Sequence, residues 1–259
     1  MMETNLIGSR YFLVEPIGSG GEARVFRARD TTTETEVALR APSEPRAAQT
    51  FEALPDFHEN WVRLLDSGTD PEFGVYQVFE LLKGETLGRI FERGPLNHED
   101  WLSFAKQSLL AVEALHFAEM VHGDLNADNF FRAEESPALW KLLELPFLRF
   151  DPPPGRTFLF GSIRTFAPEQ FDGAPVSVAT DLYALGCLYY YAASGDYPHP
   201  GVTRQEIAVN CLRFDPMPLA EKAPQFPAGW SSWVMTLLAR DPAKRFTSAT
   251  AAHHLLAIA

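Results

Sequence analysis

Two polar side chains, Asp124 and Asn129, stand five positions apart in the segment His122-Gly123-Asp124-Leu125-Asn126-Ala127-Asp128-Asn129. A carboxylate and an amide in this order can serve phosphoryl transfer, in which the carboxylate orients the attacking hydroxyl and the amide oxygen holds magnesium. We interpret His122 as a packed structural histidine and not as a base. The competing interpretation is a polar loop that follows a helix and carries no chemistry.

A second segment that could contact a phosphate is Gly18-Ser19-Gly20-Gly21-Glu22-Ala23-Arg24-Val25. It falls between two predicted strands, so it lacks the following helix that a dinucleotide-binding fingerprint needs. In a β-hairpin, such glycines let backbone amides approach a phosphate closely. A flexible hairpin turn is the alternative, because glycine motifs alone are weak evidence.

The elements that must position these segments change character near Gly84. Before it, Gly, Pro and Thr clusters separate short predicted strands, and only one short helix is expected. After it, apolar residues recur at helical spacing, and the stretch 178–193 is apolar nearly all round, which indicates a buried central helix. We therefore predict an α+β fold in which a β-rich lobe, residues 1–82, precedes a larger helical lobe, residues 83–259. The expected strands are 11–17, 25–28, 36–41, 62–66, 75–80 and 140–143; the expected helices are 47–54, one that begins near Asn97, 178–193, 230–240 and 248–258; residues 151–155 are expected to form an irregular loop.

Composition narrows the classes of protein that this chain can be. Its 259 residues, 46% of them apolar, are enough for a sizeable core. The formal net charge of -12 argues against nucleic acid and anionic membranes as main partners. Two cysteines, Cys187 and Cys211, imply no disulfide framework and favour a reducing compartment. We find no signal-peptide pattern and no apolar run long enough to span a membrane, so the expected location is cytoplasmic.

The order of the motifs resembles that of the eukaryotic-type Ser/Thr protein kinases, as also found in bacteria, from residue 9 to residue 259. Ala167-Pro168-Glu169 is similar to the motif that closes the activation segment of that family, and 181–186 is similar to the start of its central helix. Arg245 matches the arginine that pairs with the Glu169 position. His-Gly-Asp also resembles small-molecule kinases, but these lack the later set. The resemblance implies one bilobal kinase-like domain with a shortened αC helix, in which four residues have structural roles: His122, Glu169, Asp181 and Arg245.

The resemblance also implies where a nucleotide and a metal would bind. Phe79 aligns with the gatekeeper, and Phe131 aligns with the residue that floors the adenine pocket. Their two rings could fill the space that adenine uses, or they could be ordinary core packing. Asn129 and Glu144 would be the ligands if any metal binds. The implied nucleotide-binding positions are Gly18, Gly20, Val25, Ala38, Arg40, Phe79, Leu81 and Phe131.

The small lobe departs from the kinase pattern at its charged pair. Arg40 stands where the family has lysine, and no lysine precedes Lys83. The planar fork of an arginine does not replace an ammonium point charge well; among the arginines, Arg24 is one that could substitute. Gln49 matches the position of the partner glutamate. The first helix must be short, because 17 residues separate Arg40 from His58, and this makes Glu52 a displaced alternative partner.

The large lobe departs from the pattern at three more places. Glu144-Leu145-Pro146 replaces Asp-Phe-Gly. Glutamate is longer than aspartate by one methylene, and a misplacement of about 1 Å can cost about 100-fold in rate. Pro146 has a fixed φ and no N–H. Gly123 removes the arginine that grips an activation-loop phosphate, and Asn126 replaces the lysine that neutralises the transferred phosphate.

We therefore predict a pseudokinase with Asp124 as a vestigial base position. It is expected to bind ATP weakly or not at all; no cofactor is expected, although weak ATP and magnesium binding stays open. It would act through a protein partner, such as an active kinase or another domain of a longer chain. The alternative is a divergent active Ser/Thr kinase. It is favoured by Asp124, Asn129, the glycine segment, Glu144 as a potential metal ligand, and Ser162, which aligns with a threonine of that family. A small-molecule phosphotransferase is the third hypothesis.

Overall fold

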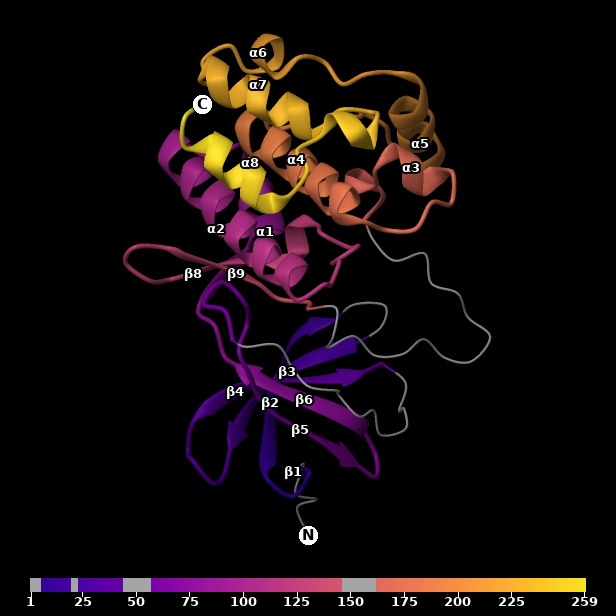
Figure 1. The fold of residues 1–259 in the computed structure, drawn as a ribbon. Coiled ribbons are helices and arrows are strands. Elements are labelled where there is room, and N and C mark those ends of the chain that lie inside the picture. Colours follow the sequence, from indigo (N-terminus) through magenta and orange to yellow (C-terminus); the bar gives the residue numbers. More distant parts are fainter. Residues whose placement is uncertain (1–5, 20–22, 44–56, 146–161) are drawn as a thin grey trace. The chain divides into compact units, whose positions relative to one another are not determined.

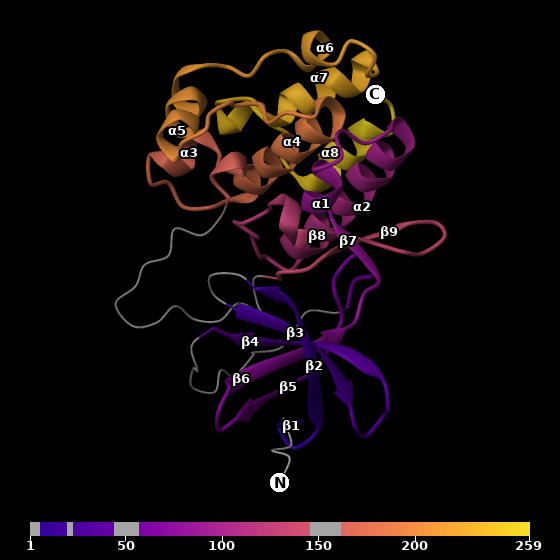
Figure 2. The same ribbon diagram turned by 180° about the vertical axis from the view of Figure 1, so that it is seen from behind.

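The computed structural model describes residues 6–19, 23–43, 57–145 and 162–259. The chain divides into two compact units. The first, here the small lobe, comprises residues 1–57, 62–83 and 147–156; the second, here the large lobe, comprises residues 58–61, 84–146 and 157–259. Figures 1 and 2 show the small-lobe strands and the large-lobe helices from two sides. Each lobe is described by itself below.

The small lobe is an antiparallel sheet of six strands in the order β1-β2-β3-β4-β6-β5. Side chains alternate between its faces, as they must in a pleated strand. One face builds a core that includes Tyr11, Leu39, Tyr76 and Val78. The strands are β1 Leu6–Ile7, β2 Tyr11–Ser19, β3 Ala23–Asp30, β4 Glu36–Pro42, β5 Leu64–Asp70 and β6 Gly74–Glu80.

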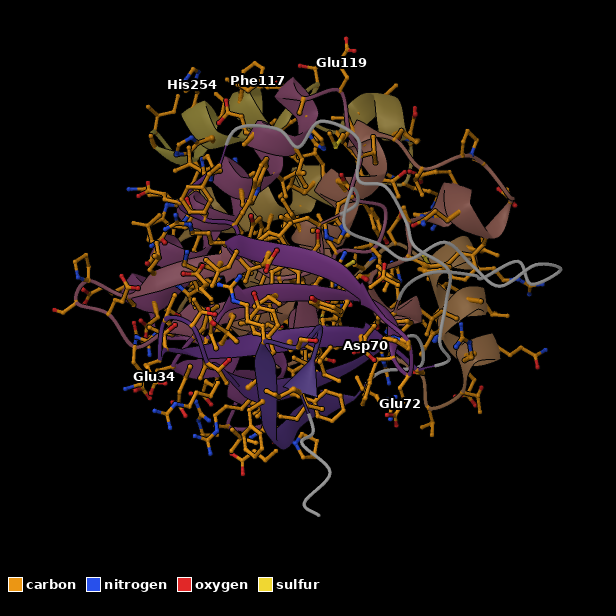
Figure 3. All side chains as sticks on the ribbon, turned by 90° about the horizontal axis from the view of Figure 1, so that it is seen from below. Glu34, Asp70, Glu72, Phe117, Glu119 and His254 are labelled. Atoms are coloured by element: carbon orange, nitrogen blue, oxygen red, sulfur yellow. The ribbon has the colours of Figure 1, made fainter. Side chains whose placement is uncertain are left out.

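The sheet curls, so that residues near β1 and β2 reach the edge strand β5. Tyr11 Oη donates to Asp66 Oδ2 at 2.5 Å, and Arg10 Nη1 donates to the same oxygen at 3.1 Å. Gly8 N donates to Asp70 Oδ2 at 3.0 Å. Asp70 also closes the β5–β6 turn by accepting from Glu72 N at 2.9 Å; Figure 3 labels both residues. These contacts join the β1–β2 turn and the start of β2 to the edge strand β5.

The large lobe is mainly helical, with the long helix α4 at its centre. α4 is buried on nearly every side and packs against α2 and α7. Gly186 permits this approach, because a Cβ there would lie 2.8 Å from Leu237 Cβ. The helices are α1 Leu87–Phe91, α2 His98–Phe117, α3 Pro168–Phe171, α4 Val178–Ser194, α5 Arg204–Arg213, α6 Leu219–Lys222, α7 Ala228–Leu237 and α8 Ala249–Leu256; the short 3-10 helices are η1 Ala127–Asn129, η3 Ile163–Thr165 and η4 Pro242–Lys244; the sheet β7-β8-β9 comprises Gly84–Thr86, Phe130–Ala133 and Leu139–Leu142.

Most predicted elements are present, with shifted ends. Strands β2, β3, β4, β6 and β9 and helices α4, α7 and α8 occur close to their predicted ranges, and Asn97 caps α2 by accepting from Asp100 N at 2.9 Å. The strand predicted at 62–66 was wrong at its start: Trp61 forms an isolated bridge with Leu142, and β5 begins only at Leu64. The predicted helix at 47–54 and the loop at 151–155 lie outside the described residues. In the described part of the chain, no helix is both long and apolar enough to cross a bilayer.

Candidate functional site

Asp181, in the first turn of α4, anchors the segment that carries Asp124. Its Oδ2 accepts the backbone N–H of His122 at 2.8 Å, and its Oδ1 accepts that of Gly123 at 2.7 Å. His116 Nε2 lies 2.9 Å from the same Oδ2. Asp181 is fully buried, as is His122, whose Nδ1 accepts from Asp124 N at 3.2 Å. The backbone around Asp124 is therefore held by the central helix of the lobe.

Two amides then fix Asp124 itself. Asn129 Nδ2 donates to the Asp124 carbonyl at 2.8 Å, so the structure brings together the two residues that the motif paired. Asn126 Nδ2 donates to the carboxylate Oδ1 of Asp124 at 3.0 Å. Asn126 Oδ1 accepts from Asp128 N at 2.9 Å and so begins η1. Asn126, at the position of the family's phosphate-neutralising lysine, thus contacts the carboxylate of Asp124.

Glu144 follows β9, and the backbone there is bonded to Asn129. Leu143 N donates to the Asn129 carbonyl at 2.8 Å, so the chain enters Glu144 beside that residue. Asn129 Oδ1 makes no hydrogen bond to another described residue. One amide oxygen and one carboxylate suit magnesium, which prefers oxygen ligands and keeps several waters. The described residues contain no group of three or more His, Cys, Asp or Glu side chains placed to hold a metal.

Glu169 and Arg245 form a bidentate ion pair. Nη1 of Arg245 lies 2.6 Å from Oε1 of Glu169, and Nη2 lies 2.8 Å from Oε2. The arginine side chain is fully buried, donates to the carbonyls of Ala179 and Ala239, and lies 4.7 Å from the ring centroid of Tyr183. This pair ties α3, which begins with Pro168, to the start of α4 and to the segment after α7.

The small-lobe positions share one face of the sheet. Register pairs Val25 with Arg40 and Ala38 with Phe79 across β3, β4 and β6. Leu39, between Ala38 and Arg40, belongs to the core on the opposite face. Strand alternation therefore gathers four of the predicted nucleotide-binding residues on one surface.

Arg40 is bonded on that face to a residue that sequence reasoning missed. Its Nη1 donates to Gln77 Oε1 at 3.0 Å, and both side chains are buried. Gln77 lies directly opposite Arg40 on β6. The sequence carried one signal for Gln77, which is the single amide in the otherwise apolar run 75–79. A buried polar side chain needs a hydrogen-bonding partner, and this indicates a bond to a neighbouring strand.

Arg24 lies on the opposite face, so it does not substitute for the missing lysine. It pairs in register with Ala41, which belongs to the core face. Its guanidinium carbon lies 5.7 Å from the ring centroids of both Phe26 and Phe73. The suggestion that Arg24 could replace the lysine was therefore wrong, because adjacent residues of a strand point to opposite faces.

The other predicted positions are distributed as follows. Gly18 pairs with Val25, and Leu81 follows β6 and is half-buried. Phe131 lies on β8 of the large lobe, where its Cε1 would be 3.0 Å from a Cβ at Gly84. Ser162 precedes η3 and accepts through its carbonyl from Thr165 Oγ1 at 3.1 Å. Four predicted positions lie outside the described residues: Gly20, Gln49, Glu52 and Pro146.

With this geometry in view, comparison with known proteins shows the family. The family model described as a protein kinase domain matches residues 11–257, so the chain belongs to the protein kinase family. A probable serine/threonine-protein kinase of Clostridium perfringens is 26% identical over 94% of this chain and 37% of its own length. A serine/threonine-protein kinase of Myxococcus xanthus is 27% identical over 94% of this chain and 32% of its own length.

A probable serine/threonine-protein kinase of Streptomyces coelicolor is 29% identical over 96% of this chain and 40% of its own length. The chain thus spans about a third to two-fifths of the length of these relatives. The predicted bilobal kinase-like fold, with a β-rich small lobe and a larger helical lobe, and the resemblance to bacterial kinases of the eukaryotic type are confirmed.

Proposed function

We propose that this kinase-family domain is a pseudokinase, with little or no phosphotransfer and weak or no binding of ATP. It acts as a regulatory or scaffolding domain through protein contacts, with an active kinase or another domain of a longer chain as partner, in the cytoplasm. The observation that carries the proposal is the hydrogen bond from Arg40 to Gln77.

In the kinase family, a lysine at the Arg40 position supplies a compact positive charge to the nucleotide phosphates. Here the guanidinium is larger and is already bonded to Gln77 inside the sheet face. Drawing Arg40 away would break this hydrogen bond between two buried side chains. A hydrogen bond to a charged group contributes about 1.5–3 kcal/mol, and a nucleotide would have to offset this loss. This supports weak or absent ATP binding.

The loop at Asp124 supports loss of transfer chemistry. Phosphoryl transfer is catalysed mainly by positioning and by fixed charges. Asn126 is neutral and is bonded to the Asp124 carboxylate, so it cannot neutralise a transferred phosphate as an ammonium does. Residues that act as a unit are strongly non-additive, so change at Arg40, Asn126 and Glu144 together leaves little activity.

The residues with structural roles in the family, in contrast, are present and bonded. The buried pair of Glu169 and Arg245 and the anchor at Asp181 maintain the large lobe. Asn129 and Glu144 would hold magnesium if it binds, and the ion would then supply charge neutralisation at the nucleotide phosphates. A maintained fold beside altered charge positions favours a binding role.

A divergent active Ser/Thr kinase is the second candidate, because one observation favours it. Asn129 and Asn126 hold the backbone and the carboxylate of Asp124, which is the preorganisation that a catalytic base needs. The similar bacterial proteins are also named serine/threonine-protein kinases.

A radiolabelled-ATP transfer assay with magnesium or manganese separates the two candidates. We expect wild type to give no more label than Asp124→Ala, and the triple variant Arg40→Lys/Asn126→Lys/Glu144→Asp to give more. Robust wild-type turnover that Asp124→Ala abolishes would overturn the pseudokinase proposal. Thermal unfolding with ATP and metal is the second readout: a tight ligand at 100 times its Kd stabilises by about 2.7 kcal/mol, and we expect far less.

A further inference from the structure

A small polar cavity lies inside the large lobe beside the Asp124 loop, which is defined here as residues 122–129. Its volume is about 10 Å³, close to the space that one water molecule needs. Its walls come from three parts of the lobe, which are the Asp124 loop, the segment 165–170 and the first two turns of α4. An occupant of this cavity would therefore contact three segments that are separate in the sequence.

The polar walls of the cavity include buried side chains. Thr165 is 4% exposed, and Asp181 is 1% exposed. An apolar cavity stays dry, whereas buried polar groups are normally bonded to protein atoms or to ordered water. The hydrogen bonds that these wall residues already make thus decide what the cavity can hold.

One wall of the cavity supplies hydrogen-bond donors. Gln170 Oε1 accepts from Ala167 N at 2.9 Å, and this bond fixes which end of the amide is the oxygen. The other end, Nε2, carries two N–H groups. It makes no hydrogen bond to another described residue. Gln170 therefore offers N–H donors at its wall of the cavity.

Two other walls supply acceptors. Thr165 Oγ1 gives its proton to the carbonyl of Ser162 at 3.1 Å, so its lone pairs remain able to accept. Asp181 Oδ1 accepts from Gly123 N at 2.7 Å, and a carboxylate oxygen can accept a second hydrogen bond. The cavity thus has acceptors at residues 165 and 181 and donors at residue 170.

We infer that the cavity holds one ordered water, which accepts from Gln170 and donates to Thr165 and Asp181. A bound cation would need acceptors alone, and a bound anion would need donors alone. A water needs both, and a buried water typically makes about three hydrogen bonds. The mixture of donors and acceptors on the walls therefore selects water among small occupants.

This water gives the Asp124 loop a second support. Asp181 already holds the loop through two backbone N–H groups. The bridge adds a connection to Thr165 and Gln170, which flank the motif at 167–169. A bridging water is nearly as favourable in enthalpy as a direct hydrogen bond, so Thr165 and Gln170 are positioning residues for the loop. The inference goes beyond the proposed function, because it holds whether or not the domain transfers phosphate.

A high-resolution crystal structure of the purified chain tests the inference. We expect a single solvent peak within hydrogen-bonding distance of Gln170 Nε2, Thr165 Oγ1 and Asp181 Oδ1. In solution, nuclear Overhauser effects between the side-chain amide of Gln170 and water should have the sign of a long-lived contact. Thr165→Val should lose both signals, because it removes an acceptor at nearly constant volume. Thr165→Ser is the matched control, since it keeps the hydroxyl and should keep both.

Three outcomes overturn the inference. These are a wild-type cavity without ordered solvent, an ion in the cavity identified by its anomalous scattering, and a solvent peak that Thr165→Val leaves at full occupancy. A lower thermal midpoint of Thr165→Val is not decisive by itself, because this variant also loses the bond to Ser162. Should Thr165→Val fail to fold, the wild-type density and the Gln170 amide signals decide alone.

Discussion

Arg40 and Gln77 face one another across β4 and β6, and the guanidinium Nη1 donates to the amide Oε1 at 3.0 Å. Both side chains are buried. The nearest equivalent of the kinase lysine is thus part of the sheet's own hydrogen bonding. Removing one partner of a buried, hydrogen-bonded charge is costly, whereas replacing both partners by apolar side chains of similar size costs little.

Replacing only the acceptor should therefore destabilise the domain. We expect Gln77→Leu to lower the free energy of unfolding by about 1–3 kcal/mol, because it removes an acceptor from a buried guanidinium. Arg40→Met/Gln77→Leu should recover part of the loss. Urea denaturation of the four proteins in the double-mutant cycle measures this coupling. Ser67→Ala is the control, since Ser67 is exposed opposite Gln77 on β5; strictly additive effects of the two substitutions would contradict the expectation.

Gly123 should tolerate no side chain without loss of stability. Its φ is +71°, and a Cβ would lie 3.2 Å from both Cγ atoms of Val176. Left-handed backbone costs an alanine about 1–2 kcal/mol, and the contact adds to this. We expect Gly123→Ala to lower the thermal midpoint and Gly123→Ala/Val176→Ala to recover only the contact part. Complete recovery in the double variant would show that backbone strain contributes nothing.

His199 should make the stability of the large lobe depend on pH. Burial, and to a smaller extent the nearby positive charge of Arg240, lower the pKa of His199 to about 4. Its Nε2 lies 2.8 Å from Tyr183 Oη. Because the folded pKa is below the unfolded value of about 6.5, the unfolded chain binds more protons between these pH values. The stabilising effect is therefore complete above pH 6.5 and is lost as pH falls toward 4.

The measurement is urea denaturation at pH 7, 6, 5 and 4. Wild type should lose up to about 3 kcal/mol more than His199→Gln over this range. The comparison isolates the histidine, since carboxylates titrate in both proteins. Parallel pH profiles for the two proteins would exclude this role of His199.

Much of this architecture follows from patterns that local sequence carries. Clusters of Gly, Pro and Thr bound the small-lobe strands, and α4 is apolar nearly all round, so local composition was enough to predict them. Helix α5 was not predicted because Val209 and Leu212 on its solvent face break the amphipathic pattern. The late start of β5 reflects the bridge between Trp61 and Leu142, which joins residues far apart in the chain.

The sequence predicted which residues belong to the site more completely than it predicted the hydrogen bonds between them. The motif placed Asp124 and Asn129 together, and the resemblance to kinases placed Arg245 with Glu169. The bonds of Arg40 to Gln77 and of Asn126 to Asp124 were not foreseen. They depend on strand register and on side-chain rotamers, which single-residue patterns do not encode.

The pair of Arg245 and Glu169 should behave differently from the pair of Arg40 and Gln77. We expect Arg245→Met to cost about 3–5 kcal/mol, the range for breaking a buried ion pair from one side. Here the matched double variant, Arg245→Met/Glu169→Leu, should not recover the loss. The guanidinium also donates to the carbonyls of Ala179 and Ala239, and these oxygens remain without their donor in both variants.

Arg245→Lys separates charge from geometry at this site. An ammonium keeps the charge but cannot reproduce the planar fork that contacts both oxygens of Glu169 and three carbonyls at once. We expect it to fall between wild type and Arg245→Met in urea denaturation. If Arg245→Met/Glu169→Leu instead unfolds within about 1 kcal/mol of wild type, the carbonyl contacts contribute little and the ion pair alone accounts for the effect.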